Sequence, residues 1–349
     1  MKVFVTGATG LLGNNLVRAL VWEGYEVKAL VRSKEKAQRQ LGELQNVEFV
    51  VGDICNVNAF AEHLSGCDVL FHTAAYFREY ARRGDPENLL QTINVDATVK
   101  LFEMADQRGV KRGIFTSSSG TIGVKADGSP GDESTPPAKI AFENKYFYSK
   151  VLAEKALNEI APKLKMEILH ILPGWMFGPG DAAPTGAGQL VIDFLKRKLP
   201  GIPAGGTKTV DARDVANAMV TAIYKGRANQ RYIVGGRFFT LKEIFQTLEN
   251  VSGVLSPKFV LPKPLMYAAA WVEETKARLR GTEANLTIMG VKTIAAKLSA
   301  ASALAERELN AKFRPLEETL RDTTQWFAEN GYVEQKNVSK LVLAKPVYK

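Results

Sequence analysis

The chain opens with Met1-Lys-Val-Phe-Val-Thr-Gly-Ala-Thr-Gly-Leu-Leu-Gly13, which carries the strongest signal for its architecture. The β-branched, apolar run at residues 2–6 predicts a buried parallel strand. Gly7, Gly10 and Gly13 follow at intervals of three, and the apolar residues after them recur at helical spacing. A strand, a glycine turn and a helix are the context in which backbone N–H groups bind a dinucleotide pyrophosphate. The alternative, an ordinary strand–helix turn with incidental glycines, is weaker because both flanking elements are present.

Strands and helices alternate from the first strand to Pro173, which predicts an α/β fold with a doubly wound parallel sheet of the Rossmann type. After Pro173 the pattern loosens, since residues 178–207 are rich in Gly and Pro and residues 265–330 are mostly helical in pattern. The expected strands are 2–6, 25–31, 45–51, 67–72, 111–116, 165–172 and 231–234, and the expected later helices are 56–65, 86–108, 143–161, 209–224 and 240–251.

This pattern predicts two parts and a tail. Residues 1–173 and 208–235 are expected to form the dinucleotide-binding Rossmann domain. Residues 174–207 and 236–333 are expected to form a smaller, mostly helical C-terminal substrate-binding lobe, and 334–349 a peripheral tail.

Composition limits the possible function classes. The chain has 349 residues, 46% hydrophobic and 24% charged, which are the values of a globular enzyme. Its two cysteines, Cys55 and Cys67, argue against a disulfide framework and favour a cytoplasmic location. The net charge of +9 lacks the basic–aromatic clusters of a nucleic-acid binder, and the apolar run Pro264–Val272 is too short for a membrane span. No signal peptide and no metal-ligand spacing are visible.

The residue after the second strand indicates which nucleotide binds. An NAD site places Asp or Glu there for the ribose hydroxyls, but this chain has Arg32 and no acid beside it. A guanidinium can bind a 2′-phosphate, so NADP(H) is the expected cofactor and NAD(H) the less favoured one. A solvated arginine at a strand end is the alternative. Asp53, after the third strand, either accepts from the adenine amino group or caps a helix, and both interpretations stay open.

A tyrosine and a lysine suggest the reacting group. Tyr146 and Lys150 are four residues apart in a predicted helix and therefore share a face. An ammonium beside a phenol favours the phenolate, so Tyr146 can act as an acid or base in carbonyl–alcohol chemistry. Residues 117–119 are serines just beyond the fifth strand, at the sheet edge where ligands bind in such folds. The alternative is a helix-face pair that only packs.

Together these motifs resemble the extended branch of the short-chain dehydrogenase/reductase superfamily, and most closely its dihydroflavonol-4-reductase-like group. The resemblance extends over nearly the whole chain. Its motifs are Thr6–Gly13, Gly52-Asp53-Ile54, Asn94-Val95, Phe115-Thr-Ser-Ser118, Tyr146-Phe-Tyr-Ser-Lys150, Pro173-Gly-Trp-Met-Phe-Gly-Pro179, Val210-Asp-Ala-Arg-Asp214 and Trp326-Phe-Ala-Glu-Asn-Gly-Tyr332.

The resemblance implies a role for each matching residue. Ser118 would bind the substrate oxygen, Tyr146 would be the acid/base, and Lys150 would bind the nicotinamide ribose and tune Tyr146. Asn94 would be a structural or proton-relay residue. The implied catalytic residues are thus Ser118, Tyr146 and Lys150, and the cofactor-binding residues are Gly7, Thr9, Gly10, Leu11, Leu12, Gly13, Arg32, Asp53, Ile54, Thr73, Ala74, Ala75, Thr116, Tyr146, Lys150, Pro173 and Met176.

Two departures and two competing functions qualify this expectation. Plant dihydroflavonol reductases have asparagine where this chain has Gly123, so flavonoid specificity is not implied, and Asn310 stands where the group usually has glycine.

The expected function is NADPH-dependent reduction of an aldehyde or ketone to an alcohol. The expected partner is a small molecule, and the expected oligomeric state is a monomer or homodimer. An NAD-dependent nucleotide-sugar epimerase or dehydratase is the first alternative, disfavoured by the serines at 117–119. A non-catalytic NADP-sensing regulator is the second, disfavoured by the retained Tyr146 and Lys150.

Overall fold

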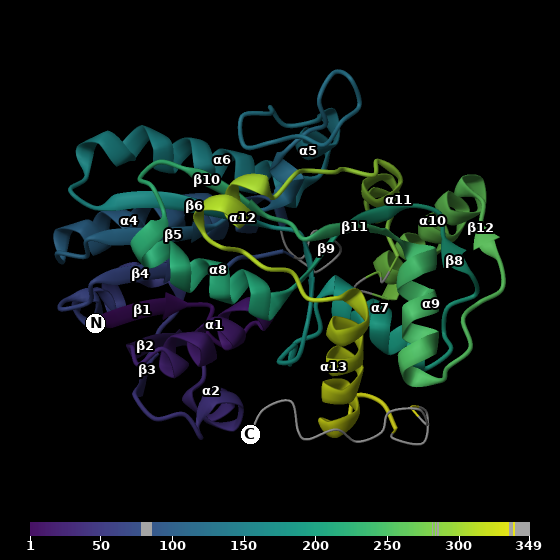
Figure 1. Ribbon diagram of the computed structural model, residues 1–349, viewed down its shortest axis with the longest axis horizontal. Coiled ribbons are helices and arrows are strands. Elements are labelled where there is room, and N and C mark those ends of the chain that lie inside the picture. Colours follow the sequence, from purple (N-terminus) through teal and green to yellow (C-terminus); the bar gives the residue numbers. More distant parts are fainter. Residues whose placement is uncertain (78–85, 281, 283, 285, 335–337, 339–349) are drawn as a thin grey trace.

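A seven-stranded parallel sheet forms the centre of the molecule (Figure 1). The computed structural model describes residues 1–77, 86–280, 282, 284, 286–334 and 338. The strands are β1 (Lys2–Thr6), β2 (Glu26–Val31), β3 (Val47–Val51), β4 (Val69–His72), β5 (Arg112–Thr116), β6 (Glu167–Pro173) and β10 (Arg231–Val234). Their order is β10-β6-β5-β4-β1-β2-β3, so the direction of winding changes beside β1, and the predicted doubly wound sheet is confirmed.

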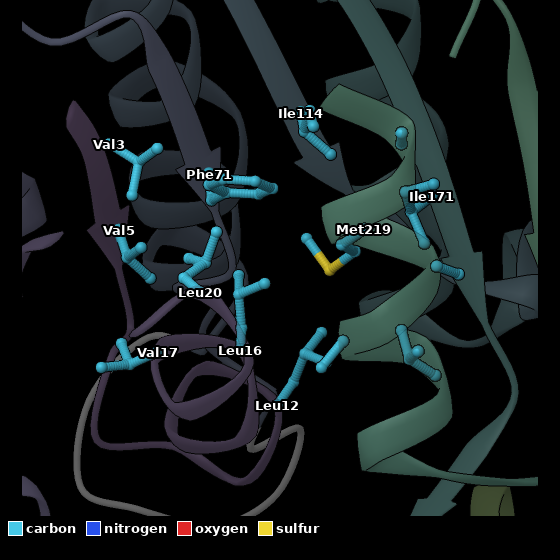
Figure 2. Packing of buried hydrophobic residues seen from close by; sticks show 14 of the residues in the cluster. Val3, Val5, Leu12, Leu16, Val17, Leu20, Phe71, Ile114, Ile171 and Met219 are labelled. Carbon is cyan, nitrogen blue, oxygen red and sulfur yellow. The ribbon is translucent and has the colours of Figure 1, made fainter. Parts of the chain in front are cut away.

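One face of the sheet is covered by α1 (Leu11–Trp22), α2 (Lys34–Leu41) and α8 (Ala212–Lys225). The helical spacing read from the sequence is borne out in α1, because its periodic apolar residues are buried. Figure 2 shows side chains of α1 and Met219 of α8 directed toward the same apolar layer as the strands. That layer includes Val3, Val5, Leu12, Leu16, Val17, Leu20, Phe71, Ile114, Ile171 and Met219.

The opposite face is covered by α4 (Ala97–Gln107) and α6 (Lys145–Ile160), together with the short 3₁₀ helices η1 (Ile54–Ala59) and η2 (Ala61–Leu64). Phe4 of β1 is buried in this second layer, with Phe60 stacked on it at 5.9 Å between ring centroids. Smaller elements complete this side: α3 (Pro86–Leu89), the π-helical turn η3 (Leu90–Asp96), η4 (Ser119–Thr121), α5 (Lys139–Glu143) and η5 (Ala161–Lys163).

A separate apolar cluster, which we call the second cluster, is distinct from both layers that cover the sheet. It lies around Phe194, Phe245 and Phe327. Two small sheets accompany it: β11-β9-β7, and the pair β12-β8. The strands are β7 (Trp175–Phe177), β8 (Ile202–Pro203), β9 (Gly206–Asp211), β11 (Arg237–Thr240) and β12 (Val260–Leu261), and the helices of this region are α7 (Gly186–Leu195), α9 (Leu241–Ser252), α10 (Lys263–Arg280), α11 (Ile288–Ala295) and α13 (Leu316–Glu329). The short helix α12 (Ala303–Glu308) packs instead on the large sheet.

The C-terminal segments do not all stay with this cluster. Ala305 and Leu309, in and after α12, are buried with residues of the large sheet. Within the tail predicted to be peripheral, Val338 is buried in the second cluster, whereas 335–337 and 339–349 lie outside the described residues. The division into two parts therefore stays a prediction.

Several element predictions need correction. Residues 56–65 form parts of η1 and η2 rather than one helix, because the backbone leaves the helical region at Phe60 between them and at Asn56 within η1. The helix expected at 86–108 is interrupted by the π turn at 90–96. Thr209–Asp211 belong to β9, and Asp211 then caps α8 by accepting a hydrogen bond from Arg213 N. The glycine-rich stretch 178–207 contains α7, which begins at the Thr185 cap.

The departure at Asn310 has a backbone explanation. Its φ is +51°, in the left-handed region that glycine adopts freely and asparagine tolerates best among the other residues. Asparagine therefore preserves the backbone shape that the group achieves with glycine.

Candidate active site

The glycine turn after β1 is sterically required. Gly7 has φ +69°, and a Cβ on it would lie 2.6 Å from Ala74 N. A Cβ on Gly13 would lie 2.1 Å from Gly7 O, so α1 packs on the turn only without a side chain there. Gly10 begins α1 with no side-chain cap, and the first helical turn carries no acidic residue. The helix N-terminus thus presents backbone N–H groups suited to an anion, with Thr9 in the turn and Leu11 and Leu12 buried behind it.

The tips of β2 and β3 carry the two residues expected to select the nucleotide. Arg32 is exposed directly after β2. Burial and the neighbouring Asp53 raise the pKa of the Cys55 thiol, and the positive charge of Arg32 partly offsets that rise. Asp53 Oδ1 accepts a hydrogen bond from Cys55 N at 2.8 Å and so caps η1, which begins at Ile54. The helix-cap interpretation of Asp53 is confirmed, and an adenine contact stays a prediction.

The segment after β4 is fixed to the end of β1. Thr73 Oγ1 donates to Thr6 O at 2.7 Å, and Ala74 N donates to Thr6 Oγ1 at 3.2 Å. His72 lies behind them with Nδ1 2.7 Å from Thr6 Oγ1 and Nε2 2.9 Å from Thr98 Oγ1. Complete burial lowers the pKa of His72 to about 3, which keeps the ring neutral. Sequence reasoning placed Thr73–Ala75 at the cofactor cleft but missed His72 and Thr98 as their support.

Asn94 ties this segment to α6. Its side chain accepts from Tyr76 N and donates to Tyr76 O, each at 2.7 Å, and also donates to Ser149 Oγ at 2.9 Å. Ser149 Oγ donates in turn to Tyr146 O at 2.7 Å. Asn94 lies in the π turn, a local widening that often marks functional positions. These contacts give Asn94 a structural role, and its proton-relay role stays a prediction.

The end of β5 and the start of α6 meet at Lys150. Its Nζ donates to Thr116 O at 2.8 Å and lies 5.9 Å from the centre of the Tyr146 ring. The Thr116 hydroxyl is buried and has no hydrogen-bond partner among the described residues. Ser118 follows at the same edge, partly buried, with Oγ accepting from Gly120 N at 3.1 Å and its own proton available to donate. The three predicted catalytic residues thus come from two adjoining segments.

Burial alters the charge state of Lys150. Because the side chain is fully buried, its pKa falls to about 7, and the Glu154 carboxylate one turn later opposes that shift. Lys150 therefore gains and loses its proton close to neutral pH, and a bound anionic group favours its charged form.

Glu154 belongs to a buried network that sequence reasoning missed. Ser117 Oγ donates to Glu154 Oε1, and Thr121 Oγ1 lies 3.1 Å from the same oxygen. Arg231 Nε lies 2.8 Å from Glu154 Oε2, in an ion pair whose N–H does not point at the carboxylate. Arg231 also donates to Thr121 Oγ1 at 2.9 Å. An acidic residue four after Lys150 was the available signal, but Arg231 lies on β10 and is distant in sequence.

Replacing Glu154 by glutamine is expected to lower the free energy of unfolding by about 3 kcal/mol, because Arg231 loses a largely buried counter-charge. Urea unfolding of both proteins measures this. The matched control is Glu159→Gln on the same helix, where an exposed pair with Lys155 contributes about 0.5 kcal/mol or less. Equal small losses in the two variants would contradict the stabilising role of the network.

The remaining predicted residues follow β6. Pro173 ends that strand, and Met176 in β7 is partly buried against the apolar layer between α1, α8 and the large sheet. Asn15 of α1 donates to Pro179 O at 2.9 Å, which brings the 173–179 segment beside the glycine turn. The sequence suggests apolar or aromatic pocket walls at Tyr76, Phe77, Tyr80, Trp175 and Met176, with core packing an equally good interpretation of each. Phe77 is exposed, Trp175 packs edge-on against Phe177, the Tyr76 backbone is hydrogen-bonded by Asn94, and Tyr80 lies outside the described residues.

Comparison with known proteins shows that most of this chain matches one family model and one full-length relative. The model of the NAD dependent epimerase/dehydratase family matches residues 3–235. A Synechocystis sp. protein provisionally named dihydroflavonol 4-reductase is 34% identical over 337 residues, which cover 95% of this chain and 96% of that protein.

Two solved structures resemble this one over most of its length. The yeast methylglyoxal/isovaleraldehyde reductase Gre2 complexed with NADPH has a TM-score of 0.72 at 25% identity, covering 95% of this chain and 100% of that one. The UDP-glucuronic acid 4-epimerase of Bacillus cereus in complex with UDP-glucuronic acid and NAD has a TM-score of 0.75 at 19% identity, with the same coverage. At 19% identity the second likeness concerns the fold alone.

Proposed function

The chain belongs to the NAD-dependent epimerase/dehydratase family, and from this premise we propose that it is an NADPH-dependent oxidoreductase that reduces an aldehyde or ketone to an alcohol. The observation that carries the proposal is the position of Lys150. It is buried between the Thr116 carbonyl at the end of β5 and the ring of Tyr146, at the sheet edge that also holds the glycine turn.

The residues present fit a nicotinamide dinucleotide. The tight turn, which has room for no Cβ at Gly7 or Gly13, leads to an uncapped helix N-terminus, as a pyrophosphate requires. Farther along the same edge, the buried Thr116 hydroxyl lacks a protein partner among the described residues, and Lys150 has donors beyond the one used by Thr116 O. When bound, NADPH would supply the hydride.

The side chains divide the rest of the chemistry. Ser118 donates a hydrogen bond to the substrate carbonyl oxygen, and that bond strengthens as negative charge develops there. Tyr146 gives its phenolic proton to the same oxygen. Lys150 stabilises the resulting phenolate and holds the nicotinamide ribose, while the Thr116 carbonyl, Asn94 and Ser149 fix the orientation of the helix that bears both residues.

Arg32 supports the choice of NADPH. Replacing it with alanine is expected to weaken NADPH binding by roughly tenfold to a hundredfold, the value of a charge-assisted hydrogen bond of about 1.5–3 kcal/mol. NADH affinity should change little, because NADH lacks the 2′-phosphate. Dissociation constants for both nucleotides measure the effect. Arg39→Ala is the control, since Arg39 is exposed and paired with Glu35. Equal binding of NADPH and NADH by the unaltered protein would contradict the proposal.

The substrate is expected to be a small carbonyl compound other than a flavonoid. A side chain at Gly123 would begin 2.6 Å from the Pro136 carbonyl oxygen, so the asparagine of plant dihydroflavonol reductases cannot occupy this position without a backbone shift. The chain therefore lacks both that contact and the space for it.

A carbonyl panel tests the proposed activity. Purified protein is incubated with NADPH and a series of aldehydes and ketones, and the cofactor content of the protein as isolated is measured in parallel. We expect exchangeable NADP(H) and NADPH consumption with at least one carbonyl compound. Tightly held NAD with turnover of a UDP-sugar would support the epimerase instead, and NADPH binding without any turnover would support the regulator.

A further inference from the structure

Helix α10 carries an apolar face on its solvent side. Its inner side chains Met266, Ala270 and Ala277 are buried, the first two beside Val291 of α11. On the opposite side, Leu265, Val272 and Leu279 recur every seven residues and form one stripe, with Trp271 beside it. Leu279 is 83% exposed and Trp271 62% exposed. We call Leu265, Trp271, Val272 and Leu279 the outer face of α10.

This face lies far from the proposed dinucleotide cleft. In Figure 1, α10 lies with β12 at the end of the molecule away from the seven-stranded sheet. Two further exposed apolar residues lie shortly before α10: Phe259 precedes β12, and Val260 is its first residue. A group of large exposed apolar side chains of this kind on one element marks an interaction site rather than ordinary surface.

Charge indicates the partner. Residues 258–280 contain five Lys and Arg against two Glu, a net charge of +3. Both acids are engaged: Glu273 pairs with Lys276 at 3.0 Å, and Glu274 Oε1 accepts from Ile288 N at 2.8 Å. Arg278 and Arg280 are exposed beside Leu279. A tryptophan–leucine face flanked by cations is the composition of helices that lie in the interface of an anionic bilayer.

We propose that the outer face of α10 docks the protein on the surface of an anionic lipid bilayer. The helix lies on the membrane and does not cross it, since no helix among the described residues is long and apolar enough to span one. A second copy of the chain fits less well, because a symmetric contact through α10 would bring like charges together. The proposal does not depend on the proposed function.

Vesicle sedimentation tests the proposal. The full chain is centrifuged with vesicles of phosphatidylcholine alone and with vesicles that also contain phosphatidylglycerol. We expect binding to the anionic vesicles, weakened by salt, and little binding to the neutral ones. Trp271→Glu should weaken binding by about tenfold or more, because it removes the interfacial aromatic side chain and adds a repelled charge. Leu279→Glu should do the same, and provides a second variant if the first does not fold.

The matched control is Trp22→Glu, the same substitution at an 89% exposed tryptophan on α1. It should bind vesicles like the unaltered protein, and thermal unfolding confirms that all variants are folded. Absence of binding to anionic vesicles, or equal binding by all four proteins, would overturn the proposal. So would a dimer in analytical ultracentrifugation that Trp271→Glu and Leu279→Glu both dissociate, since the face would then join two copies.

Discussion

Tyr146→Phe is expected to lower the turnover number by about two to four orders of magnitude, the usual loss when one acid/base group is removed. Affinity for NADPH should stay nearly unchanged, because the ring remains on α6 against Phe147, with its centroid 5.9 Å from that ring. Only the phenolic hydroxyl is lost, and the proposed reaction needs its proton at the carbonyl oxygen. Steady-state turnover and an NADPH binding titration on the same preparation separate the two effects.

Tyr148 provides the control for this prediction. It lies two residues later on the same helix, is 41% exposed, and its ring faces Phe142 at 6.0 Å rather than Lys150. Tyr148→Phe should therefore keep nearly full turnover. An inactive Tyr148→Phe together with an active Tyr146→Phe would show that the wrong tyrosine is assigned as the acid.

Lys150→Met is expected to reduce both turnover and cofactor affinity. Methionine has a similar length and an apolar end, so it can fill the buried space while removing the cation beside Tyr146. Loss of a charged donor to the ribose corresponds to roughly a tenfold to hundredfold weaker NADPH binding. The rate should fall further because the phenolate loses its stabilising charge. Turnover and the NADPH dissociation constant are measured together.

Lys155→Met is the matched control on the same helix. Lys155 is exposed and paired with Glu159, so its loss should change neither quantity appreciably. If Lys150→Met lowers turnover while NADPH affinity stays at its original value, Lys150 acts on Tyr146 only and its ribose contact is refuted.

The pH dependence of activity offers a further check. Because the pKa of Lys150 is about 7, its charged form is lost as pH rises. Activity measured below saturating cofactor should therefore fall as pH rises through 7.

The parts of the fold that depend on local pattern could be predicted from the sequence. The glycine turn, the strand at 2–6 and the strand at 231–234 lie where the residue pattern places them, since buried β-branched runs and helical periodicity are local signals. Tyr146 and Lys150 share a helix, so their pairing was also predictable.

The parts that depend on distant partners could not be predicted. Thr209–Asp211 form a strand because β7 and β11 flank them, and nothing within those three residues indicates such partners. The π turn places Asn94 between Tyr76, which follows β4, and Ser149 of α6, so its contacts form only when these separate segments are in place. The pair of Glu154 with Arg231 joins α6 to β10, and its members are remote in the chain. Local pattern predicts the candidate reactive side chains, whereas the groups that position them depend on the folded arrangement.

We propose that this site reduces a carbonyl compound with net consumption of NADPH, and a label followed through a single turnover tests this most directly. NADPH carrying deuterium at the transferable position of the nicotinamide is mixed with a carbonyl substrate found in the panel, and products are analysed by mass spectrometry. We expect one deuterium on the alcohol carbon for each NADP⁺ formed, and neither product with Tyr146→Phe on the same timescale. Sugar epimerisation with no net change in the cofactor, or an unlabelled alcohol, would contradict it.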